Sequence, residues 1–313
     1  MPLYNSKIWI RLITSSLVIF FAGRRLPEYA RFFLSQPYKR TQLRLLVLNA
    51  IIFLPELSVI TGAIVVAHDP KLALAGILGI NLFNLFTLAL LLSLNKGKKF
   101  DIHYTTVLSS IILTIVVCLG IWKGGVGILH VSWASLILLV GYLFYVKVSM
   151  DILSRPTESE LKIHIIYARL FIASLLIFAI GGPLAYACHE MATAFKLNTS
   201  LVGGFLLATI TCSPRIASLS SQMREGKLSE VINTTLHSSI FTLGILVFLA
   251  DLFYVKAPLF VEATTIHFWL ALEGILLMAI SYLILVYKRP TFSPLLIITI
   301  YITSFLIFLY KAL

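Results

Sequence analysis

Residues 49–84 read NAIIFLPELSVITGAIVVAHDPKLALAGILGINLFN, and this stretch decides the fold. Two apolar spans flank a short polar turn at residues 68–71, and Pro55 and Glu56 lie in the middle of the first span. A carboxylate near the centre of a bilayer costs about 2.5–3.5 kcal/mol, so Glu56 is a candidate for a functional site. Pro55 removes a backbone donor beside it, which predicts a broken helix that lines a cavity.

A second stretch repeats this arrangement at residues 206–242, which read LLATITCSPRIASLSSQMREGKLSEVINTTLHSSIFT. Aligning Pro214 with Pro55 places Arg215 at the position of Glu56. The other matching segments are residues 224–227 with 69–71, and residues 237–242 with 79–84. Two proline-interrupted spans at corresponding places in two halves predict the binding site of an inverted-repeat transporter.

Composition places the chain among membrane proteins with several spans. Its 313 residues are 59% hydrophobic and 12% charged, and the mean hydropathy is +0.97. The chain is therefore predicted to lie within a lipid bilayer, which is its expected partner. The net charge of +12 is typical of cytoplasmic loops and does not indicate a nucleic-acid partner. The three cysteines lie in apolar spans without the spacing of a disulfide framework or a zinc site.

Segments of about 20 apolar residues predict about ten spanning helices. The expected ranges are 8–34 (bent at Pro27), two within the stretch that opens at residue 49, 104–122, 128–148, 163–195, two in the second copy, 266–287 and 293–309. Five spans lie in residues 1–148 and five in residues 163–313, with a cytoplasmic linker at 149–162. An odd number per half inverts the second half. Lysine and arginine in the loops predict a cytoplasmic membrane protein with both termini outside.

The two copies resemble the alpha-repeats of the sodium/calcium exchanger superfamily of cation/calcium antiporters. Those repeats carry a G-T-S-x-P-E segment and then G-N-x-x-G-S-N-x-F-N. The matching segments are Leu54-Pro55-Glu56-Leu57 and Gly79-Ile80-Asn81-Leu82-Phe83-Asn84 in the first copy, and Thr211-Cys212-Ser213-Pro214 in the second. The resemblance implies an all-α fold of two inverted five-helix repeats, and ion antiport by alternating access rather than enzymatic activity.

The chain departs from this family at the ion ligands. Of the four central ligand positions that the resemblance implies, only Glu56 keeps a carboxylate, so it is the one candidate metal ligand. The other three positions hold Gly76, Arg215 and Thr234. Calcium requires roughly six to eight oxygen ligands, usually with several carboxylates. These replacements argue against a calcium site of the family kind.

Arg215 is the most informative departure. We predict that it faces Glu56 across the inverted repeat and forms a buried ion pair with it. Arginine stays protonated in proteins, so it would repel a divalent cation about 5 Å away by about 7 kcal/mol at an effective dielectric of about 20. Two alternatives remain open at this point: Glu56 is a structural carboxylate with other partners, or Arg215 extends to the membrane interface.

Small polar side chains surround the two prolines in the sequence. The candidates to line the same cavity are Asn81, Asn84, Thr211, Ser213, Thr234, Ser238 and Ser239. The alternative for each is an interhelical hydrogen bond, the usual role of such residues in membrane bundles. His237 also occupies a repeat position, where its protonation could be coupled to transport or where it could be a hydrogen-bonded core residue.

The sequence therefore predicts a cation antiporter that carries Na⁺, H⁺ or Ca²⁺ past Glu56, with no bound cofactor. Arg215 would act as an internal counter-charge. Two other functions remain open: a transport-inactive membrane protein that keeps the fold for binding or assembly, and an anion carrier anchored by Arg215. An enzyme is the least expected function, because no nucleophile–base pair or metal constellation stands out in the sequence.

Overall fold

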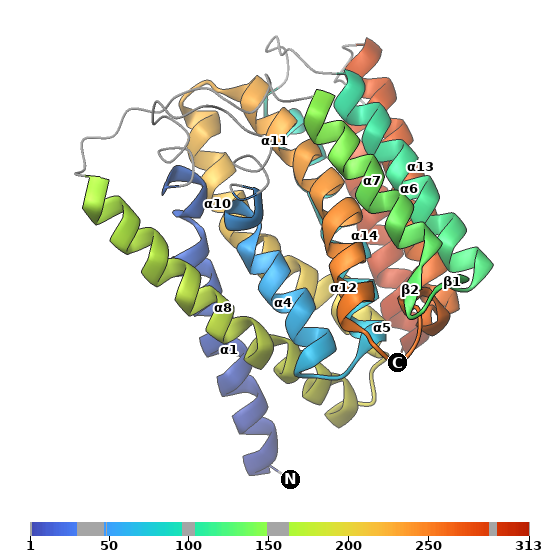
Figure 1. The fold of residues 1–313 in the computed structure, drawn as a ribbon. Helices are drawn as coiled ribbons and strands as arrows, with labels where there is room; N and C mark the ends of the chain where they lie inside the picture. The colour runs from blue at the N-terminus through green and yellow to red at the C-terminus, as the bar shows by residue number, and fades with distance from the viewer. Residues whose placement is uncertain are drawn as a thin grey trace.

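The computed structural model describes residues 2–29, 47, 49–95, 104–148, 163–287 and 293–312, which are almost entirely helical (Figure 1). Seven helices are long and apolar enough to cross a bilayer. Three shorter apolar helices bring the apolar helices within these ranges to ten. Five of the ten precede residue 149 and five follow residue 162, which is consistent with the predicted number of about ten.

The first half holds five spanning helices and a small antiparallel hairpin: α1 (Pro2–Gly23), α4 (Leu54–Val65), α5 (Pro70–Leu94), α6 (Tyr104–Lys123), β1 (Gly127–Ile128), β2 (Val131–Ser132) and α7 (Trp133–Val148). The second half contains α8 (Ile163–Ala194), α9 (Thr199–Leu201), the π-helix η1 (Val202–Leu207), α10 (Ala208–Arg224), α11 (Leu228–Phe241), the π-helix η2 (Thr242–Leu246), α12 (Val247–Phe253), the 3₁₀ helix η3 (Leu259–Glu262), α13 (Thr265–Tyr287) and α14 (Ser293–Ala312).

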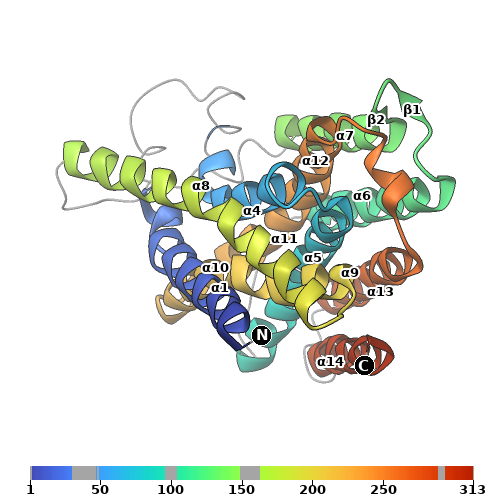
Figure 2. The same ribbon diagram turned by 90° about the horizontal axis from the view of Figure 1, so that it is seen from below.

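Helix α5 is the centre of the bundle. Most of its residues are buried, and it packs against α10, α11, α13, α14 and η1. A helix that is apolar on every side belongs inside a protein, which explains this position. The view from below shows α5 surrounded by other helices, with α1 and α8 on one side and α13 and α14 on another (Figure 2).

Two glycine contacts bring helix backbones together. A Cβ atom on Gly79 of α5 would lie 1.9 Å from the carbonyl oxygen of Gly204 in η1. A Cβ atom on Gly62 of α4 would lie 2.6 Å from the Cα atom of Gly182 in α8. Small residues permit such close approach between membrane helices, so these four glycines set the spacing of the central helices.

The turn between α4 and α5 is tied to the long helix α8. Asp69 caps α5 by accepting a hydrogen bond from the backbone N–H of Leu72 at 2.9 Å, and Pro70 follows at the first helical position. The other carboxylate oxygen of Asp69 lies 2.8 Å from Nδ1 of His189 in α8. One residue on, Glu190 accepts a hydrogen bond of 2.5 Å from Arg11 of α1.

The first predicted span is interrupted just before Pro27: α1 ends at Gly23, the chain turns at residues 24–25, and a short helical segment follows at 26–29. The break lies four residues before Pro27, where a proline ring clashes with the helix. One predicted span is wrong at its start. The fifth helix begins at Trp133 rather than at residue 128, because residues 127–132 form the hairpin. The predicted linker at 149–162 and the end of the first span at 30–34 lie outside the described residues.

Candidate functional site

Glu56 lies at a break in the first proline-containing span. Phe53 has non-helical φ and ψ angles of −99° and 20°, and α4 begins at the next residue with Pro55 in its first turn. Proline suits this position because its missing N–H would have no partner in the first turn. Glu56 is 2% exposed and follows in the same turn, where the partial positive charge of the helix N-terminus favours a carboxylate.

Arg215 lies on a helix that its own proline does not interrupt. Pro214 is inside α10, which runs without a break from Ala208 to Arg224. The predicted interruption of the second span at Pro214 is therefore wrong. The irregular backbone lies two turns earlier in the π-helix η1, where Gly203 and Gly204 pack closely against α5. Close packing of the two backbones offers a physical reason for the irregularity to lie there.

The predicted contact between Glu56 and Arg215 is present. Nη2 of Arg215 pairs with Oε1 of Glu56, and both side chains are almost completely buried. Nη1 donates to Oδ1 of Asn84 at 2.6 Å and to the hydroxyl of Ser238. Asn84 also donates to Ser238 at 3.0 Å. We name these four residues the central cluster; they come from α4, α5, α10 and α11.

An aromatic layer covers one face of the central cluster. The ring of Phe53 lies 5.0 Å from Cζ of Arg215, within cation–π range, and stacks on Phe241 with ring centroids 4.6 Å apart. Nδ1 of His237 lies 3.2 Å from the hydroxyl of Tyr145 in α7. In the G-T-S-x-P-E segment of the family that this sequence resembles, a serine holds the position of Phe53. In this chain an aromatic ring and a guanidinium therefore occupy this side of the site.

The other predicted site residues lie outside the central cluster. Thr211 donates to the carbonyl oxygen of Leu207 at 2.6 Å, and Ser213 donates to that of Ile210 at 2.8 Å, so both hydroxyls bond within their own helical segment. The remaining three are Asn81, which is buried near Gly274 of α13, half-buried Thr234, and Ser239, which is fully buried on α11. Their predicted roles as ion ligands stay predictions.

A polar cavity lies beyond the central cluster along α10. It has a volume of about 430 Å³, and its walls come from residues 24–28 just after α1, from the second half of α10 and from the turn that follows α10. Ser218, Ser221 and Gln222 continue the face of α10 that carries Arg215, at spacings of three, six and seven residues. Gly23 of α1 packs directly on Pro214 and Pro55, so this cavity begins where α1 leaves the two prolines.

Sequence reasoning missed two buried acids. Asp251 of α12 is fully buried and accepts hydrogen bonds from the backbone N–H groups of Ser132 and Leu259. Glu273 of α13 is 8% exposed and lies in the middle of an apolar helix. The signal that identified Glu56, a carboxylate within a spanning segment, applies equally to Glu273. No proline or repeat match marks it, and it makes no contact with the central cluster among the described residues.

The described residues around Glu56 do not resemble a site for a divalent metal ion. In the part of the chain that the structure describes, no group of three or more His, Cys, Asp or Glu side chains could hold a metal ion. Glu56, the one candidate metal ligand, is bound to Arg215. The central cluster therefore presents one carboxylate, one amide and one hydroxyl around a guanidinium.

Comparison with known proteins bears on the architecture. No protein-family model matches the sequence, and no curated protein matches it. The H⁺/Ca²⁺ exchanger CAX has a solved structure that matches with a TM-score of 0.72 at 14% identity, over 97% of this chain and 88% of its own. The structure of native YfkE matches with a TM-score of 0.69 at 16% identity, over 96% and 91%.

The sodium-calcium exchanger NCX_Mj matches with a TM-score of 0.60 at 15% identity, over 95% of this chain and 97% of its own. The chain has the fold of these cation exchangers. The resemblance found in two short segments therefore holds for the exchanger fold over nearly the whole chain. Within this fold, α5 packs against α4, α10 and α11, and these four helices carry the two matching stretches.

Proposed function

We propose that this chain is a membrane antiporter for a monovalent cation or proton, working by alternating access, in which Arg215 is a fixed counter-charge at the central site. The observation that carries the proposal is the buried guanidinium of Arg215, bound to Glu56, Asn84 and Ser238. This arrangement supplies an internal positive charge to the carboxylate that would otherwise bind a transported cation.

Charge argues against calcium as the transported ion. Calcium binding would place two positive charges beside Arg215, with a repulsion of about 7 kcal/mol at about 5 Å. It would also need roughly six to eight oxygen ligands, and the three polar neighbours of Arg215 are already engaged with the guanidinium. A single positive charge competing for Glu56 meets about half that repulsion and needs fewer ligands.

The polar cavity beside α10 supports a route to the site. Ser218 and Ser221 lie one and two turns beyond Arg215 on the same helix, and the cavity also holds the charged residues of the 224–227 turn. That turn belongs to the lysine- and arginine-rich side of the sequence, which we assign to the cytoplasm. Both termini would then face outward from the cell membrane.

One observation favours a transport-inactive protein as a second candidate. Asn84 and Ser238 bond to each other as well as to Arg215, so the central cluster is closed on itself. A permanently closed cluster would hold the fold together without exchanging ions. An anion carrier is less well supported, since the guanidinium already has three partners.

Ion flux in proteoliposomes tests the proposal. Purified native protein would be assayed under sodium, potassium, proton and calcium gradients, beside Glu56→Gln and the control Glu262→Gln, which changes an acid outside the polar cavity and keeps an acceptor for the Tyr254 hydroxyl. We expect monovalent cation or proton flux that Glu56→Gln abolishes and Glu262→Gln preserves, with no calcium flux. Calcium flux in the native chain, or flux that survives Glu56→Gln, would overturn it. A silent native chain that gains cation flux with Arg215→Glu would favour the transport-inactive candidate.

A further inference from the structure

Glu273 of α13 is a buried carboxyl that the central cluster does not use. It is more than nine-tenths buried, and neither of its carboxyl oxygens makes a hydrogen bond of normal distance and angle within the described residues. Only the Ser304 hydroxyl of α14 lies beside it as a weak partner. Glu56 has an arginine at hydrogen-bond distance, whereas Glu273 has no cation at all in the described part of the chain.

The surroundings of Glu273 are neutral on every packed side. From α14, the Tyr301 phenol is near enough to sense its charge, and Cys212 of α10 lies near that phenol. From α5 and α6, Asn81 and Thr114 approach the adjacent Gly274. The charged residues of these two helices, Lys71 and Lys123, are at their ends. Nothing described near Glu273 would therefore compensate a negative charge.

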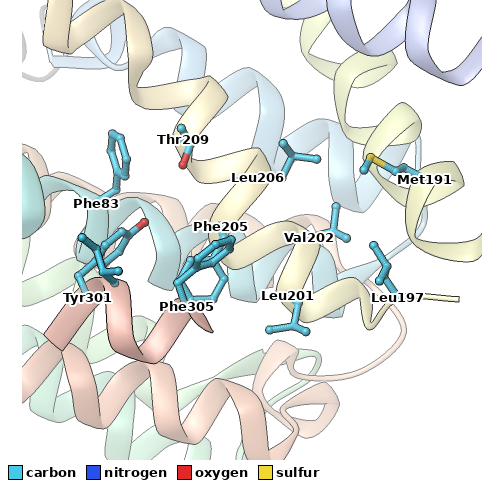
Figure 3. A pocket seen from close by; sticks show the side chains of 11 residues that line it. Phe83, Met191, Leu197, Leu201, Val202, Phe205, Leu206, Thr209, Tyr301 and Phe305 are labelled. Carbon is cyan, nitrogen blue, oxygen red and sulfur yellow. The ribbon is translucent and has the colours of Figure 1, made fainter. Parts of the chain in front are cut away.

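Tyr301, whose phenol is near enough to sense the charge of Glu273, lines an apolar cavity of about 400 Å³ (Figure 3). Thr209 of α10 also belongs to the walls of this cavity, with its hydroxyl on the side of Tyr301. The rest of the lining is almost wholly hydrocarbon, including the aromatic rings of Phe83, Phe205 and Phe305. Such walls offer a carboxylate almost no solvation.

We propose that Glu273 is a proton-binding site within the membrane, separate from the central cluster, and that it holds a proton at neutral pH. An ionised carboxylate buried without a counter-ion is far less stable than the neutral acid, because its charge loses solvation and is not compensated. Glu56 shares its site with a permanent cation, so of the two acids Glu273 is the one that holds a proton at neutral pH when no gradient is applied.

Helix α5 connects the two acids. Asn84 of α5 accepts a hydrogen bond from Arg215, and on the same helix Phe86 stacks on the Tyr301 ring with centroids 4.8 Å apart. Asn81 meets α13 beside Glu273. A change of charge at Glu273 would thus act on the helix that holds the central cluster. This coupling rests on the proposed antiport, whereas proton binding itself does not.

Infrared spectroscopy of the reconstituted full-length protein tests the site. We expect the C=O stretching band of a protonated carboxyl at neutral pH in the native chain, lost in Glu273→Gln and kept in Glu56→Gln and in the control Glu262→Gln. Glu273→Asp keeps a carboxyl and should shift the band, which guards against a variant that fails to fold. Absence of the band in the native chain, or its loss in Glu56→Gln rather than in Glu273→Gln, would overturn the proposal.

The infrared and flux experiments test the proton site and the antiport separately, so either proposal can be contradicted without the other. A Glu273 band without any flux of a monovalent cation or proton would leave the proton site standing and contradict the antiport. Flux without the Glu273 band would support the antiport and contradict the proton site. If both are present, Glu273→Gln should make the flux insensitive to the proton gradient, whereas unchanged proton dependence would exclude the coupling through α5.

Discussion

At the residue scale, one substitution changes the chemistry of the centre. Arg215 occupies the position that mirrors Glu56 in the second stretch, and its guanidinium collects the carboxylate, Asn84 and Ser238. A guanidinium is planar and permanently charged, so it can bind several oxygens at once. Phe53 then covers it with an aromatic face. Each of the two buried charges, on Glu56 and on Arg215, is therefore stabilised by the other.

The pair should reveal this dependence in stability measurements. Arg215→Ala leaves the buried carboxylate of Glu56 without its cation, and we expect the free energy of unfolding to fall by about 3–5 kcal/mol. Replacing both residues, as Glu56→Gln with Arg215→Met, should cost less than Arg215→Ala alone, because no isolated charge remains. Chemical unfolding in detergent micelles measures both. Equal losses for the single and double variants, or no loss for the single one, would contradict the ion pair's role.

At the element scale, glycines rather than prolines shape the second stretch. Pro214 leaves α10 continuous, while η1 brings Gly204 onto Gly79 of α5 at backbone contact. The alignment of Pro214 with Pro55 nevertheless identified the two residues that meet, Arg215 and Glu56. The register of the repeat could therefore be predicted from sequence. The backbone shape could not, because it depends on how closely a distant helix approaches.

Gly79→Ala tests the closeness of that approach. The new Cβ atom would lie 1.9 Å from the carbonyl oxygen of Gly204, which cannot move without its helix. We expect a loss of about 1–3 kcal/mol or more in stability, measured by thermal unfolding in detergent. Gly141→Ala in α7 is the matched control, because its Cβ would meet only the end of the Leu113 side chain at 3.0 Å. Equal behaviour of the two variants would argue against a tight α5–η1 contact.

At the scale of the whole molecule, the described cavities differ in chemistry. The cavity between α1 and α10 is polar and charged, whereas the cavity between α10 and α14 is almost wholly apolar. A hydrated ion can enter only the first, because the second offers it no polar ligands beyond Tyr301 and Thr209. On the proposed route, the membrane orientation of the polar cavity decides the side from which the central cluster is reached.

Cysteine labelling can determine this orientation. Ser221 lines the polar cavity and is exposed, while the three native cysteines are buried and unpaired. We expect a membrane-impermeant thiol reagent to label Ser221→Cys from the cytoplasmic side only. Ser239→Cys, which replaces a fully buried residue, serves as the unreactive control. Labelling of Ser221→Cys from the outer side, in right-side-out vesicles, would reverse the proposed topology.

Sequence alone determined the number of spans and the identity of the charged pair. Both follow from local rules: a bilayer requires about 20 apolar residues per helix, and a buried charge within one is conspicuous. Tertiary structure decided which polar groups join the pair. Asn84 and Ser238 reach Arg215, whereas Thr211 and Ser213 bond within their own helical segment. The reason is helix rotation, which hydropathy leaves open and which only packing between helices far apart in the sequence settles.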